Sequence, residues 1–192
     1  MDFFTSFISA FVVLFAIMDP FASIPLYLSL TKKMSDEQKT SAANNAVLVA
    51  AIIAFAFLFF GTAVLGAFGV TLASFKVFGG FVLALLALES LLGFEFRKGN
   101  EPDPHIASVI IATPMLTGPG VMTTVIVLST QFGVIPTAAA AAAALLAAWV
   151  ILRNSLRLQK LVGGNTIEVA SKVMALLLGA VGVELMRSGL GG

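Results

Sequence analysis

The stretch AIMDPFASIP, residues 16–25, decides how the rest of this chain is interpreted. It places one carboxylate, Asp19, and two prolines, Pro20 and Pro25, inside an apolar segment that extends from about residue 3 to about residue 30. This segment is longer than the roughly 20 residues that a helix needs to cross a bilayer core. Asp followed by Pro is also typical of a helix start, with Asp as the N-cap and Pro at the first helical position. The stretch therefore predicts a membrane-spanning helix that is broken at Asp19.

A second group of helix breakers lies in the middle of another apolar segment, at about 106–130. It consists of Pro114 and the run Thr117-Gly118-Pro119-Gly120. The same argument predicts two half-helices, about 20–31 and 119–131, that begin near the bilayer midplane from opposite sides. Their free N–H groups and positive dipole ends converge there. Such paired ends form an anion site of the kind that discontinuous helices provide in transporters.

The composition indicates an integral membrane protein. Of 192 residues, 59% are hydrophobic and only 11% are charged, which differs strongly from soluble domains. A net charge of +1 without a long basic run argues against nucleic acid as a partner. We therefore expect an all-α integral membrane protein, a single transmembrane domain over residues 1–192, whose six helices follow the apolar segments at about 3–30, 45–68, 73–94, 106–130, 134–152 and 168–190.

The six segments divide into two similar halves, which we expect at about 1–95 and 105–190. Residues 19–31 align with 118–130, and residues 83–89 align with 178–184. Three spans in each half place the second half upside down relative to the first. Chance similarity between apolar strings is the alternative, but the helix breakers fall at corresponding places. The sequence thus predicts two inverted three-helix repeats with helices 1 and 4 broken.

The basic residues predict the orientation. Nine of the eleven lie in the connections and span ends that would face one side of the membrane, and those on the opposite side hold only Lys76 and Arg187. The positive-inside rule then places both termini outside, on the periplasmic side. The nine are Lys32, Lys33, Lys39, Arg97, Lys98, Arg153, Arg157, Lys160 and Lys172.

Both breaker motifs resemble those of the MarC family of membrane proteins, which includes SnatA-type neutral amino acid transporters. The resemblance covers essentially the whole chain. It implies six helices, a location in the cell inner membrane, a relation to the LysE-like exporter superfamily, and proton-coupled transport of small neutral amino acids such as alanine or glycine. The matching patterns are Asp19-Pro20-x-x-x-Ile24-Pro25-x-x-Leu28-Ser29-Leu30-Thr31 and Pro114-x-x-x-Gly118-Pro119-Gly120-x-x-Thr123-Thr124.

Two departures from the family pattern concern substrate choice and coupling. Ala22 and Ser23 stand where the first motif usually has Gly and Asn. Glu89 and Glu184 stand where Gln is common.

Asp19 is the strongest candidate residue, because an ionisable group at membrane depth is costly and is a functional site by default. It could hold the substrate ammonium or carry the proton, with Glu89 as a second proton-coupling candidate. The alternatives are a structural N-cap for Asp19, an interfacial position for Glu89 and small-residue packing for the rest. The expected substrate-binding set is Asp19, Pro20, Ser23, Pro25, Thr117, Gly118, Pro119, Gly120, Thr123 and Thr124.

The leading function is a secondary transporter that works by alternating access at this site, in either the uptake or the export direction. A channel or an exporter for another small solute or ion is the main alternative. An intramembrane enzyme has less support, because the chain has no catalytic motif. No cofactor and no metal site is expected, since cysteine is absent and the lone His105 lacks co-ligands. The expected partners are the amino acid, the proton and the lipid bilayer, and the small-residue faces also allow an oligomer.

Overall fold

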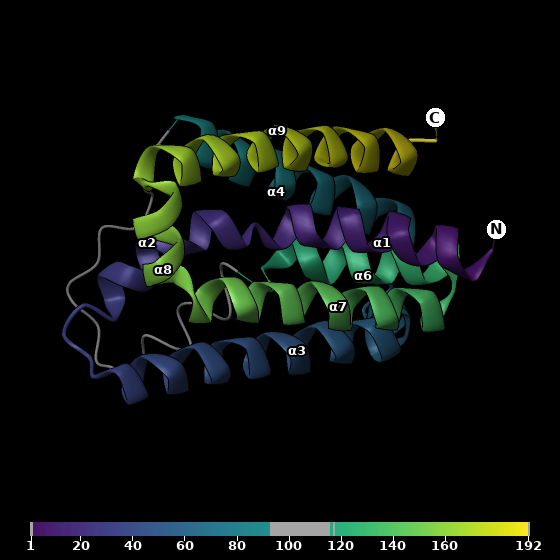
Figure 1. Ribbon diagram of the computed structural model, residues 1–192. Helices are drawn as coiled ribbons and strands as arrows, with labels where there is room; N and C mark the ends of the chain where they lie inside the picture. Colours follow the sequence, from purple (N-terminus) through teal and green to yellow (C-terminus); the bar gives the residue numbers. More distant parts are fainter. Residues whose placement is uncertain (1, 93–115, 117, 192) are drawn as a thin grey trace.

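The computed structural model describes residues 2–92, 116 and 118–191, and every regular element in them is a helix. Four long helices, α3, α4, α7 and α9, lie alongside the broken pair α1 and α2 and the shorter α6 (Figure 1). In chain order the helices are α1 (Phe3–Met18), α2 (Pro20–Leu30), α3 (Asp36–Ala67), α4 (Leu72–Leu92), α6 (Pro119–Phe132), α7 (Val134–Arg153), α8 (Ser155–Val162) and α9 (Gly164–Gly189).

The helices have the length and composition that membrane spans require. Five stretches are long and apolar enough to cross a bilayer, namely Phe3–Pro25 and the helices α3, α4, α7 and α9. The shorter apolar helix Gly120–Phe132 belongs to the fourth predicted span, whose first part lies outside the described residues. The prediction of an all-helical, six-span membrane protein is therefore confirmed at the level of helix type and number.

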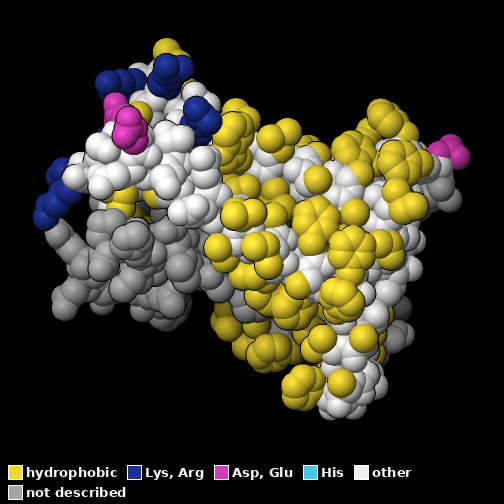
Figure 2. All heavy atoms as spheres, turned by 90° about the horizontal axis from the view of Figure 1, so that it is seen from below, with side chains coloured by type: hydrophobic (Ala, Val, Ile, Leu, Met, Phe, Trp, Pro, Cys, Tyr) yellow, Lys and Arg dark blue, Asp and Glu magenta, His cyan; other side chains and the backbone are white. Residues whose placement is uncertain are grey.

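The surface is apolar where a soluble protein would be polar. Figure 2 shows hydrophobic side chains over most of one face and Lys and Arg side chains gathered at one end. On α3, for example, the side chains of Phe59 and Phe60 are 56% and 64% exposed. Lipid tails are a favourable surrounding for such rings, so the exposed phenylalanines indicate where the bilayer contacts the protein.

Fully buried alanines line both α3 and α7, two helices that contact each other. These alanines recur every three or four residues on each helix, which places them on one helix face. Their small side chains let the two backbones approach closely, as helix pairs in membranes require. The buried alanines in the run of residues 138–148 therefore serve packing inside the bundle. The fully buried members are Ala43, Ala46 and Ala50 of α3 and Ala140, Ala144 and Ala148 of α7.

Glycine brings α4 and α9 into backbone contact. A Cβ atom on Gly80 would collide with the carbonyl oxygen of Gly182, and one on Gly182 would lie 2.7 Å from the carbonyl oxygen of Gly80. At the end of α9, Gly189 lies against Ala73 near the start of α4, so the two helices run antiparallel. This is the arrangement expected of the last helices of two inverted halves.

Other helix contacts agree with the inverted arrangement. Helix α6 contacts α3 and α4, and helix α2, its counterpart in the first half, contacts α7 and α9. The N- and C-termini lie at the same end of the bundle (Figure 1), as an even number of spans requires. The repeat boundaries at about 1–95 and 105–190, and the side of the membrane on which the termini lie, stay predictions.

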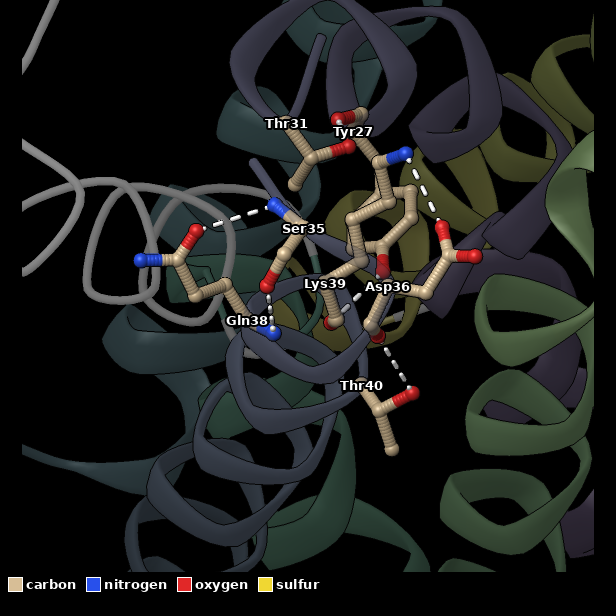
Figure 3. A network of polar contacts seen from close by, with 7 residues as sticks. All are labelled: Tyr27, Thr31, Ser35, Asp36, Gln38, Lys39 and Thr40. Carbon is tan, nitrogen blue, oxygen red and sulfur yellow. Dashed lines mark hydrogen bonds and ion pairs between the residues drawn. The ribbon is translucent and has the colours of Figure 1, made fainter. Parts of the chain in front are cut away.

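The turn between α2 and α3 is held by a polar network (Figure 3). Ser35 and Gln38 form a reciprocal capping box at the start of α3. Such a box satisfies two free N–H groups at once. The Tyr27 hydroxyl of α2 donates to the Lys39 carbonyl of α3 at 2.8 Å, and Thr31 donates to the Tyr27 carbonyl at 2.7 Å. The far end of half-helix α2 is therefore fixed to α3.

Two features differ from the expected segments. Helix α3 begins at Asp36, before the apolar segment at 45–68, because the capping box starts the helix in polar sequence. The cationic stretch between the fifth and sixth segments was expected to be a connection. It forms the short helix α8, which carries exposed Arg157 and Lys160 beside exposed Leu161. Hydropathy alone does not find such a helix, because its apolar residues are too few for a span.

Candidate functional site

The first break is a single residue that ends one helix and caps the next. Asp19 has φ 33° and ψ 67°, in the left-handed region. Asp is among the few non-glycine residues that tolerate this conformation. Its N–H donates to the Phe15 carbonyl at 3.2 Å, which closes α1, and its Oδ1 accepts from the Ala22 N–H at 3.1 Å, which caps α2. With Pro20 as the first residue of α2, the predicted half-helix start is confirmed.

The other carboxylate oxygen of Asp19 points to the second half of the chain. Ser171 of α9 donates to Oδ2 at 3.4 Å. Asp19 is only 8% exposed, and the ion pairs between described residues all involve other carboxylates, those of Asp36, Glu168 and Glu184. A buried carboxylate held by hydroxyl and amide donors alone keeps capacity to bind a cationic group.

Asp19 lies deep in the bundle but toward its cationic end. Its partner Ser171 is the eighth residue of α9, hence about 10 Å from the start of that helix at 1.5 Å per residue. Helix α8, at the same end, lies next to α2 and α9 and encloses with them a cavity of about 60 Å³ lined by Phe21, Ile24, Leu158, Val162, Thr166, Ile167 and Ala170. The lining of this cavity is mostly apolar.

Two further residues of the first motif point in opposite directions. Ser23 is buried, and its hydroxyl donates to the Asp19 carbonyl at 3.2 Å. Pro25 lies within α2 with an exposed side chain. Because Pro25 does not face the interior, its contribution is limited to the backbone of α2, where it removes a donor.

The second break is built without a carboxylate. Helix α6 begins at Pro119, and Gly118 is its N-cap in extended conformation, with φ −63° and ψ 178° and no side-chain cap. The Gly118 carbonyl accepts from Val121 at 3.0 Å and from Met122 at 3.2 Å. This confirms the predicted start of the second half-helix. Thr117 lies outside the described residues, as does the part of the fourth span before residue 116.

The first turns of α6 face α1 and α4. A Cβ atom on Gly120 would meet the side chain of Leu83 on α4 and would lie 3.4 Å from Cγ2 of Ile17, two residues before Asp19. This contact brings the second break close to the first. Thr123 lies against Gly79 of α4, and both Thr123 and Thr124 are only 2% exposed.

Thr124 carries a buried hydroxyl oxygen without a hydrogen-bond partner among the residues that the structure describes. A buried polar atom left unpaired costs about 1–3 kcal/mol. Such a group in a native structure calls for an explanation, and a ligand that binds in another state is one.

The two glutamates of the sequence analysis lie on α4 and α9. Glu89 lies half-buried near the end of α4, six residues beyond Leu83. Glu184 forms an exposed ion pair with Arg187 at 2.9 Å, as residues three apart on a helix can. The proton-coupling role of Glu89 stays a prediction.

Sequence reasoning missed Ser171 and Leu83. Both lie in segments that were predicted correctly as spans, but neither has a local signal. The one available hint for Leu83 was its place at the start of the repeat similarity of residues 83–89 with 178–184.

The comparisons with known proteins agree on one kind of protein. A family model described as "MarC family integral membrane protein" matches residues 4–192. A UPF0056 membrane protein of Aquifex aeolicus is 33% identical over 96% of this chain and 92% of its own length. A UPF0056 membrane protein of Archaeoglobus fulgidus is 31% identical over 96% and 92%. YhcE of Escherichia coli, also named a UPF0056 membrane protein, is 29% identical over 95% and 90%. No solved structure matches.

Proposed function

Because this chain belongs to the MarC family of integral membrane proteins, we propose that it is a secondary transporter of small neutral amino acids that binds its substrate between the two helix breaks. The observation that carries the proposal is the pair of breaks itself. One presents a buried carboxylate at Asp19, and the other presents the uncapped N-terminus of α6 at Gly118. An amino acid carries the two complementary charges.

The charges of the site support a zwitterionic substrate. The Asp19 carboxylate has no cationic partner among the described ion pairs, so an ammonium group would supply the missing charge. In the first turn of α6, Pro119 has no N–H, and Val121 and Met122 donate to the Gly118 carbonyl. The Gly120 N–H and the positive end of the helix dipole are therefore what this turn offers to a carboxylate. The buried Thr124 hydroxyl, one turn farther along α6, is a further donor, and it has no partner in the described part of the chain.

The arrangement of the helices supports alternating access. Half-helices α2 and α6 run in opposite directions (Figure 1), and each contacts helices of the opposite half. In transporters built this way, rocking of one repeat against the other exposes a fixed site to each side in turn. Coupling to protons and a location in the cell inner membrane are parts of this proposal.

A counterflow experiment on purified protein in liposomes tests the proposal. Vesicles are loaded with unlabelled glycine, and the uptake of labelled glycine or alanine is followed from outside. A carrier gives saturable uptake that depends on the internal amino acid. Uptake that does not saturate and ignores internal substrate indicates a channel instead. If neither glycine nor alanine crosses at all, the proposed substrate class is wrong.

A further inference from the structure

A leucine side chain fills the space beside the N-terminus of α6. Gly120 lies in the first turn of α6, and the position of a Cβ atom on it is taken by the side chain of Leu83 from α4. Leu83 is fully buried. Any group that approached the first-turn amides of α6 from this side would therefore meet Leu83 first.

The packing of α4 against α9 holds Leu83 in this place. A Cβ atom on Gly182 of α9 would lie 3.1 Å from the Leu83 Cβ, so the α9 backbone lies directly behind Leu83. One turn earlier on the same face of α4, Gly79 lies against Thr123. Helix α4 thus presents a small residue to Thr123 and a large one to Gly120, and it cannot rotate without losing both contacts.

The polar groups of the candidate site surround this leucine. Thr124 lies four residues after Gly120, hence on the same side of α6, and its buried hydroxyl oxygen is unpartnered among the described residues. Ile17, which also approaches Gly120, is two residues before the Asp19 carboxylate. Leu83 is therefore the apolar side chain of α4 that lies beside the start of α6, where the polar groups of the candidate site are found.

We propose that Leu83 sets the upper size limit of the substrate side chain. The inference rests on the proposed function, in which an amino acid places its carboxylate at the first turn of α6. The Leu83 side chain has to move aside for the substrate, and α9 behind it limits how far it can move. The remaining space accepts a hydrogen or a methyl group, as in glycine and alanine, and excludes branched side chains such as that of valine.

The test is the substrate preference of Leu83→Ala in proteoliposomes. The readout is the ratio of labelled valine to labelled glycine exchanged, because a ratio does not depend on the amount of folded protein. We expect the ratio to rise about tenfold or more, since two or three carbon atoms in an apolar pocket are worth this much discrimination. Leu152→Ala is the matched control, as Leu152 is an equally buried leucine on α7, and its ratio should equal that of the wild type.

A second variant covers the event that Leu83→Ala does not fold. Leu83→Val removes less volume and should raise the ratio of alanine to glycine without a comparable gain for valine. An unchanged ratio in a folded, exchanging Leu83 variant overturns the size limit while the transporter proposal stands. Absence of any glycine or alanine exchange in the wild-type protein overturns both.

A double variant tests the contact itself. Gly120→Ala should lower glycine exchange, because its Cβ would meet Leu83. Adding Leu83→Ala to Gly120→Ala should restore part of it. If the double variant is no better than Gly120→Ala alone, Leu83 is not the obstructing group and the proposal fails.

Discussion

At both helix breaks a proline begins the half-helix, but the residue before it differs in conformation and in chemistry. At the first, Asp19 adopts a left-handed conformation, and its carboxylate caps α2 through the Ala22 N–H. At the second, Gly118 is extended and has no side chain to cap α6. One break therefore has a negative group at its centre, and the other has amide donors and the positive end of a helix dipole.

This difference shows how two similar halves can form one asymmetric site. A pair of identical carboxylate breaks would favour a cation, and a pair of bare amide breaks would favour an anion. One of each suits a molecule with both charges, such as the amino acid of the proposed function. The following substitutions change one break at a time.

The largest effect is expected from Asp19→Asn. Asparagine tolerates the left-handed conformation and caps helices well, so both helix ends should remain. Losing one partner of a buried charge pair costs about 2 kcal/mol or more, which corresponds to a fall in glycine exchange of at least about 30-fold. Counterflow together with thermal unfolding measures this. Glu184→Gln, which changes an exposed carboxylate paired with Arg187, is the control, and equal exchange in both variants would contradict the role of Asp19.

A smaller but still large effect is expected when the second break is made to resemble the first. Gly118→Asp keeps a good N-cap in an extended conformation but places a negative charge where the substrate carboxylate should lie. We expect glycine exchange to fall about tenfold or more, because like charges in an interface repel strongly. Gly118→Asn is a cap of the same shape without the charge and should retain clearly more exchange. The same loss in both variants would show that shape rather than charge is responsible.

An intermediate effect is expected from Thr124→Val, which removes the unpartnered hydroxyl and keeps the shape of the side chain. Glycine exchange should fall about fivefold, equivalent to one hydrogen bond of about 1 kcal/mol. The free energy of unfolding should not decrease, because no described hydrogen bond is lost. Thr31→Val is the comparison, since the equally buried Thr31 hydroxyl donates to Tyr27 and its removal should destabilise the protein. A destabilised Thr124→Val with normal exchange would assign Thr124 to packing.

The smallest effect is expected from Ser171→Ala. The hydroxyl donates to Asp19 at 3.4 Å, a long hydrogen bond whose loss should cost less than about 1 kcal/mol. Exchange should fall by less than about fivefold, mainly through a higher KM, because Ser171 orients the carboxylate. Ser171→Thr keeps the hydroxyl and should recover part of the loss. If Ser171→Ala is as inactive as Asp19→Asn, the serine itself contacts the substrate.

The two helix breaks could be predicted from the sequence because the rules that place them are local. Asp-Pro and Gly-Pro predicted half-helices at about 20–31 and 119–131, and the helices extend over Pro20–Leu30 and Pro119–Phe132. Proline at the first position and a capping residue before it act within one turn, so neighbouring residues suffice. The same local rule did not tell which side chains of a half-helix face inward. Ser23 is buried and Pro25 is exposed, because the rotation of α2 depends on the helices that contact it.

By itself, the sequence determined that the chain is a bundle of membrane helices and where two of them are interrupted, because hydropathy and capping act over short distances along the chain. The tertiary structure alone decided that Ser171 contacts Asp19 across 152 positions and that Leu83 fills the space beside Gly120. Those contacts depend on the rotation and depth of α4 and α9, which follow from the summed packing of many small residues. No single motif in the chain specifies that sum.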